Sequence, residues 1–111
     1  MYTTRQNKVS RLIQKELSGI FQLYSRSHFE GRLISVTTVR ISPDLSVARV
    51  YISIFPIEKR DEIYELVNEQ ARKLRLDLGM KVGKQLRIIP QLSFFIDDSL
   101  DYADNIDKLL K

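Results

Sequence analysis

The 111-residue sequence predicts an α+β fold, in which helices pack on one face of a three-stranded mixed sheet. Three observations lead to this prediction. Two adjacent segments rich in β-branched residues flank a short turn, which is typical of an antiparallel hairpin. Residues 58–82 have the apolar spacing of a helix, and a strand-like segment follows them. A helical link between two strands of one sheet requires a right-handed parallel crossover, so the sheet is expected to be mixed.

The first element is predicted to be a helix over residues 4–24. Its apolar residues recur at i, i+3 and i+4 and form one face, while basic residues occupy the other side. Thr3 or Thr4 is expected to cap its start, because a hydroxyl can accept a hydrogen bond from a free backbone N–H. Residues 25–32 are interpreted as a polar loop. This loop contains His28, the single histidine of the chain, and we expect no catalytic role for it.

The predicted hairpin consists of residues 33–42 and 47–55. Ser42-Pro43-Asp44-Leu45 is the expected turn, because proline presets its own backbone angle and an aspartate side chain can bond nearby backbone. The second strand alternates cleanly, and it is expected at the centre of the sheet. Its predicted core side chains are Ala48, Val50, Ile52 and Ile54. Tyr51 is interpreted as adjacent to the core, so base stacking on the strands is not expected.

The helical region 58–82 is too long for so small a fold unless it bends, and we place the bend between Asn68 and Lys73. Gly83 is expected to end the region in the left-handed conformation that glycine adopts without steric cost. The third strand is predicted over residues 86–96. Its inward-facing side chains would be Leu86, Ile88, Leu92, Phe94 and Ile96.

Pro90 lies within this third strand and lacks an N–H, which suits an edge strand or a bulge. Ser99 is then expected to cap a short last helix, docked by Ile106, Leu109 and Leu110. The complete predicted order is therefore α-β-β-α-α-β-α.

The composition is that of an ordinary globular protein, with 43% hydrophobic and 29% charged residues. No apolar run reaches the roughly 18 residues that a membrane span needs, and the N-terminus has no apolar signal region. The absence of cysteine excludes disulfides and thiolate metal sites. We therefore expect a single cytoplasmic domain over residues 1–111, without a membrane partner. The net charge of +4 favours a nucleic-acid or acidic partner.

Basic residues concentrate in two helical regions. Residues 1–15 contain four basic side chains and no acid, and residues 72–87 contain six against the single acid Asp77. Because the apolar stripes turn inward, these cations are expected on exposed helix sides, where they could contact an extended polyanion such as a nucleic acid. The alternative is an ordinary solvated helix surface. The predicted RNA-binding residues are Arg5, Lys8, Arg11, Lys15, Arg72, Arg75, Lys81, Lys84 and Arg87.

Three segments give the sequence a closer resemblance. Residues 39–55 (VRISPDLSVARVYISIF), 86–100 (LRIIPQLSFFIDDSL) and 7–21 (NKVSRLIQKELSGIF) resemble the hairpin, the last strand and the first helix of the ribosome-binding factor A family. The predicted element order is also that of a type II KH domain, a small RNA-binding fold. The Gly-x-x-Gly loop of KH domains is absent. The Ala-x-Gly kink of the family aligns with Ala71-Arg72-Lys73, which keeps the alanine but not the glycine.

This resemblance implies a bacterial ribosome biogenesis factor. It implies binding to the immature 30S ribosomal subunit and assistance in late 16S rRNA processing. It also implies no enzymatic activity, and we expect no cofactor, no small-molecule substrate and a monomer when the protein is free.

Two other function classes compete with RNA binding. A protein-binding adaptor could place its basic helical face on an acidic partner, and the five aspartates within residues 97–107 could cover the basic helix of a second copy. An enzyme would need Asp97, Asp98 and Asp101 to hold a magnesium ion. The simpler interpretation is that these aspartates stabilise a helix start, so we expect no metal site and no catalytic residue.

Overall fold

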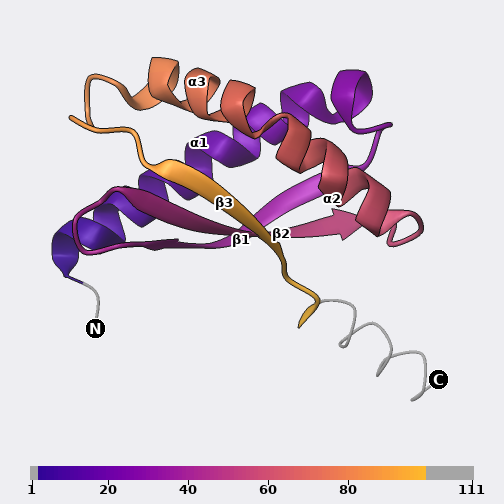
Figure 1. The fold of residues 1–111 in the computed structure, drawn as a ribbon, viewed down its shortest axis with the longest axis horizontal. Coiled ribbons are helices and arrows are strands. Elements are labelled where there is room, and N and C mark those ends of the chain that lie inside the picture. Colours follow the sequence, from indigo (N-terminus) through magenta and orange to yellow (C-terminus); the bar gives the residue numbers. More distant parts are fainter. Residues whose placement is uncertain (1–2, 100–111) are drawn as a thin grey trace.

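A computed structural model describes residues 3–99, in which three helices cover one face of a three-stranded sheet (Figure 1). The predicted α+β class and the predicted order are confirmed as far as the third strand. The predicted last helix and its docking residues lie outside the described part of the chain. The elements in order are α1 Thr4–His28, β1 Leu33–Ile41, β2 Val47–Phe55, α2 Arg60–Glu69, α3 Ala71–Val82 and β3 Gln91–Ile96.

The sheet has the predicted mixed topology, with β2 at its centre. β1 pairs with β2 in antiparallel fashion, and β3 pairs with β2 in parallel fashion after the α2–α3 crossover. Val50 lies opposite Phe94 in this register, and both side chains are buried beneath the helices, as predicted. The expectation that Tyr51 is adjacent to the core is wrong. It lies on the helix-free face, where its ring stacks on Phe95 with centroids 5.5 Å apart, because alternate residues of a strand face opposite sides.

α1 begins as predicted and ends later than predicted. Thr3 caps it through a reciprocal pair of hydrogen bonds with Gln6, a capping box. The helix continues past Tyr24 to His28, so the predicted loop is shorter than expected. The reason is Phe29, which is fully buried and whose backbone N–H donates to the Ser25 carbonyl, so the core holds the last turn in helical form.

The long helical region bends where the sequence predicted. α2 ends at Glu69 and α3 begins at Ala71, with Gln70 at φ −90° and ψ 3° between them. Gly83 corrects another expectation, because it keeps right-handed helical angles at φ −60°. Its lack of a side chain matters for space instead. A Cβ at this position would lie 2.7 Å from the Gly79 carbonyl oxygen, closer than a real Cβ approaches.

The third strand is shorter than predicted, because β3 begins at Gln91 and residues 86–90 approach it as irregular chain. Ile88 is 62% exposed here, although it was predicted to face the core. The Arg75 guanidinium donates to the carbonyls of Ile89 and Pro90 at 2.7 and 3.1 Å. Two backbone acceptors are thus held by a side chain, and Pro90 has no N–H to donate, so ladder pairing starts only after it.

Candidate nucleic-acid interface

Contacts between Tyr24 and α3 fix α1 beside that helix. The Tyr24 hydroxyl donates to the Asp77 carboxylate, and the Lys73 ammonium lies 5.2 Å from the centre of the Tyr24 ring. These contacts join the last turns of α1 to the first and middle turns of α3. The two helices therefore run in opposite directions, and the first turns of α1 lie at the same end of the molecule as the chain that follows α3 (Figure 1).

Burial of the Tyr24 phenol, together with its hydrogen bond and charge interaction with Asp77, raises the pKa of Tyr24 to about 12. Below pH 10 the phenol is protonated in the folded and unfolded states alike, so its stabilising contribution is fully present. Between pH 10 and 12 the unfolded chain releases the proton more readily. The contribution is therefore lost as the pH rises through the folded-state pKa.

Replacing Tyr24 by phenylalanine is accordingly expected to lower the free energy of unfolding by about 1 kcal/mol at pH 8. Urea unfolding at pH 8 and pH 11 checks this, because the difference between Tyr24→Phe and the parent should shrink at the higher pH. A difference that stays constant between the two pH values would show that the Tyr24–Asp77 hydrogen bond does not couple folding to ionisation.

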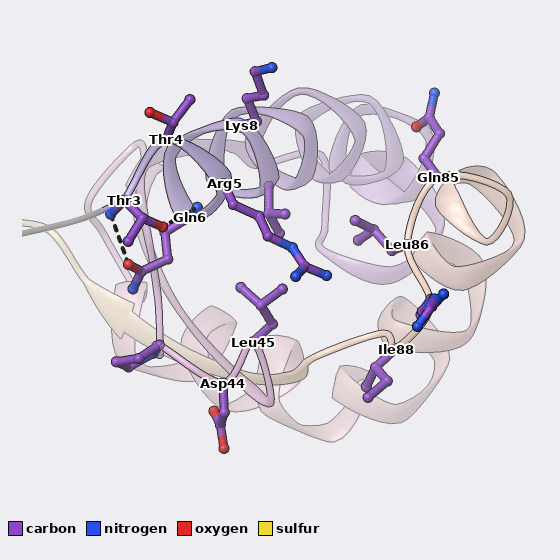
Figure 2. Close-up of a pocket in the computed structure, with 13 residues that line it drawn as sticks. Thr3, Thr4, Arg5, Gln6, Lys8, Asp44, Leu45, Gln85, Leu86 and Ile88 are labelled. Carbon is purple, nitrogen blue, oxygen red and sulfur yellow. Dashed lines mark hydrogen bonds between the residues drawn. The ribbon is translucent and has the colours of Figure 1, made fainter.

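A pocket of about 900 Å³ opens where the start of α1 meets the chain after α3. Three segments build it: the first turns of α1, the β1–β2 turn and residues 85–88 (Figure 2). Three of the predicted RNA-binding residues line it, namely Arg5, Lys8 and Arg87. The fold therefore brings together cations that are about 80 positions apart in the sequence.

A second pocket of about 550 Å³ lies beside the α2–α3 junction, and Arg72 and Arg75 line it. Ile88 lines both pockets, so the two pockets adjoin at its exposed side chain. The other predicted residues are exposed and line neither pocket. These are Arg11, Lys15, Lys81 and Lys84.

The predicted cations differ in how free they are. Arg75 is engaged with the carbonyls of Ile89 and Pro90, so it holds the chain between α3 and β3 in place. The other eight predicted residues make no hydrogen bond or ion pair within the described part of the chain. An exposed cation with no acidic neighbour keeps its full attraction for an outside anion.

Sequence reasoning missed the apolar walls of the first pocket and a second group of cations. Leu45 and Leu86 line that pocket, and a search for charged residues could not have selected them. On the helix-free face, Arg40 lies directly opposite Arg49 in the β1–β2 register, and both are exposed. The register of the predicted hairpin could have revealed this arginine pair, because the turn length fixes which residues face each other.

The hypothesis of a magnesium site gains no support within residues 3–99, where no group of three acidic, histidine or cysteine side chains is placed to hold a metal. The Asp97 carboxylate accepts hydrogen bonds from Ser99 and from the Thr37 hydroxyl, the latter at 2.6 Å. These bonds hold the pKa of Asp97 below its usual value. Asp97 therefore ties the end of β3 to β1, and Asp101 lies outside the described residues.

Comparison with known proteins identifies the family. The family model of ribosome-binding factor A matches residues 5–110. The chain belongs to the ribosome-binding factor A family. A ribosome-binding factor A from Flavobacterium johnsoniae is 47% identical over 111 residues, which cover 99% of this chain and 85% of that protein. The protein of the same name from Cytophaga hutchinsonii is 46% identical over 110 residues, with 99% and 83% coverage.

A solved structure supports the family fold. The crystal structure of ribosome-binding factor A from Thermus thermophilus is similar to this chain with a TM-score of 0.69. The similarity covers 86% of this chain and 97% of that one, at 24% sequence identity. The arrangement of helices over a mixed sheet is therefore shared with that family member.

Proposed function

We propose that this protein is a ribosome maturation factor that binds the immature 30S subunit and assists late maturation of its 16S rRNA. Membership of the ribosome-binding factor A family supports binding to ribosomes. The choice of the small subunit and of 16S rRNA rests on the resemblance of the hairpin, the last strand and the first helix to that family. The protein acts by binding and not by catalysis, and it works in the cytoplasm as a monomer built from one domain. Within residues 3–99 no helix is long and apolar enough to cross a membrane.

One observation carries the RNA-binding part of this proposal. The start of α1 and the chain after α3 meet at the first pocket and carry basic side chains that form no ion pair with an acid of residues 3–99. RNA phosphates reward such a surface, because each neutralised phosphate releases condensed counterions. The interface comprises the nine predicted residues, with Arg75 acting mainly through the backbone that it holds.

A protein-binding adaptor remains the second candidate, and exposed apolar side chains on the helices favour it. Leu76 and Met80 lie one turn apart on α3 and are 65% and 80% exposed, and Leu23 of α1 is also exposed. Large apolar groups of this kind are common at protein contacts. A ribosomal protein could therefore meet the same helices that contact RNA.

Sedimentation with immature small-subunit particles tests the proposed function. The protein should move with the particles at low salt and leave them as the salt concentration rises. Limited ribonuclease treatment of the particles should release it as well. Retention after the accessible RNA has been removed would instead favour the protein-binding adaptor. Equal binding to mature large subunits would contradict the proposed preference for the small subunit.

A further inference from the structure

The first pocket combines an apolar interior with an unpaired arginine that reaches into it. Leu45 points into it from the β1–β2 turn, and Leu86 points into it from the opposite side (Figure 2). The Arg5 side chain reaches from α1 into the space between these two leucines (Figure 2). Arg5 has no hydrogen-bond partner or ion pair within the described residues. The guanidinium plane is therefore available to a guest.

The charges around the pocket favour an anionic guest. Lys8 and Arg87 also line it, and the Lys8 ammonium extends away from the interior (Figure 2). The one acid in the lining, Asp44, points away from the space (Figure 2). Its carboxylate accepts hydrogen bonds from the hydroxyls of Ser42 and Ser46, both at 2.8 Å. Asp44 therefore stabilises the β1–β2 turn, and the charges that remain around the pocket are positive.

Leu45 is held in an unusual backbone conformation. Its φ is +63°, in the left-handed region, which a leucine adopts only at a cost because of its Cβ. The turn is closed by the Leu45 N–H, which donates to the Ser42 carbonyl at 2.9 Å. Asparagine or glycine would fit this backbone with less strain. A leucine in this position supplies an apolar wall that neither of those residues could supply.

We propose that this pocket receives a single unstacked nucleotide of structured RNA, a bulged or looped-out residue. Its base would lie between Leu45 and Leu86 against the guanidinium plane of Arg5, and its flanking phosphates would meet Lys8 and Arg87. RNA-binding proteins commonly stack splayed-out bases on arginine planes. The volume of about 900 Å³ lies in the range of small-ligand sites. The proposal rests on the proposed function, because it names the form of RNA that the interface selects.

An RNA nucleotide suits this pocket better than an acidic side chain does. A glutamate or aspartate side chain can pair with the Arg5 guanidinium, but it is too small to fill a pocket of about 900 Å³ and leaves the two leucine walls uncovered. A nucleotide can place its flat base between the leucines and keep its charged phosphates at the rim, near Lys8 and Arg87.

The test uses two RNA hairpins of equal length, one fully paired and one with a single bulged 2-aminopurine. The full-length protein should bind the bulged hairpin about tenfold more tightly. The 2-aminopurine fluorescence should rise on binding, because the base leaves its stacked neighbours and no aromatic side chain lines the pocket within residues 3–99.

Two pocket variants should remove this preference. Arg5→Lys keeps the charge and deletes the guanidinium plane, and Leu86→Ala removes one apolar wall. Their matched controls are Arg26→Lys and Leu23→Ala, at exposed sites of α1 outside both pockets. Both controls should keep the preference. Circular dichroism and thermal unfolding confirm that each variant remains folded.

Equal affinity of the parent protein for the two hairpins would overturn the inference, and so would a bulge preference that survives both pocket variants. Pocket-dependent binding of a glutamate-rich peptide without any preference for the bulge would overturn it in favour of a protein partner. Failure of the proposed function is a separate result. In that case the protein would not sediment with small-subunit particles, whatever its preference between the hairpins.

Discussion

Truncating Ile52 to alanine is expected to lower the free energy of unfolding by about 2–5 kcal/mol. Ile52 lies at the centre of the central strand, opposite Val36 of β1 and Ile96 of β3, and its side chain is 0% exposed. The truncation removes three carbon atoms from a packed interior that relaxes only in part, so the lost contacts and the cavity add. Urea unfolding followed by circular dichroism measures the effect.

Ser53→Ala is the matched control for this truncation. Ser53 is the next residue of the same strand, and its side chain lies on the helix-free face. The control should change the free energy of unfolding by less than about 0.5 kcal/mol. An equally small effect of Ile52→Ala would show that the two faces of the strand are assigned the wrong way round.

The elements with simple periodicity could be predicted closely from the sequence. Residues 47–55 alternate between apolar and polar positions, and β2 has the predicted bounds because each slip by one residue would expose its whole apolar face. The bend near Gln70 was also predictable, although no glycine or proline marks it. A 25-residue helical region has to bend in so small a fold, and the spacing of its apolar residues limits the position of the bend.

Features set by tertiary contacts could not be predicted. Phe29 extends α1 because its ring is buried in the core. The polar residues around it do not predict this burial. Gly83 serves a close approach to the Gly79 carbonyl and not a left-handed cap. The late start of β3 depends on Arg75, whose guanidinium takes two carbonyls of the approaching chain. The roles of Phe29 and Arg75 depend on residues that are distant along the chain. The role of Gly83 depends on a backbone contact that the hydrophobic pattern does not indicate.

The candidate site was predictable in its charges and not in its shape. The clusters in residues 1–15 and 72–87 indicated cations on two helices, and the structure brings Arg5, Lys8 and Arg87 around one pocket. The pocket itself depends on Leu45, whose positive φ has no signature in the residue type or in the local pattern. Charge is a property of composition, whereas concavity arises only when three separate segments meet.

For the proposed RNA-binding surface, the largest expected effect is at Lys81 and Lys84. Both are exposed near the end of α3, and neither has a partner within the described residues. Reversing both to glutamate is expected to weaken binding to small-subunit particles by about tenfold or more, because two proposed phosphate contacts would become repulsive. Folding should be little affected, because exposed charges contribute little to stability. The only favourable interaction lost is that of the Lys81 charge with the helix dipole in the last turn of α3.

The salt dependence of binding separates this effect from misfolding. If four to six cations meet phosphates, log affinity should fall with log salt at a slope of about 3–5, and the double reversal should lower that slope by about 1.5. Arg26→Glu with Lys59→Glu is the matched control. Arg26 likewise lies in the last turn of its helix, Lys59 immediately precedes α2, and neither residue lines either pocket. The control should leave affinity and slope nearly unchanged. Equal binding by the two double variants would mean that the cations of α3 are merely solvated, and that the contact with the ribosome lies elsewhere on the protein.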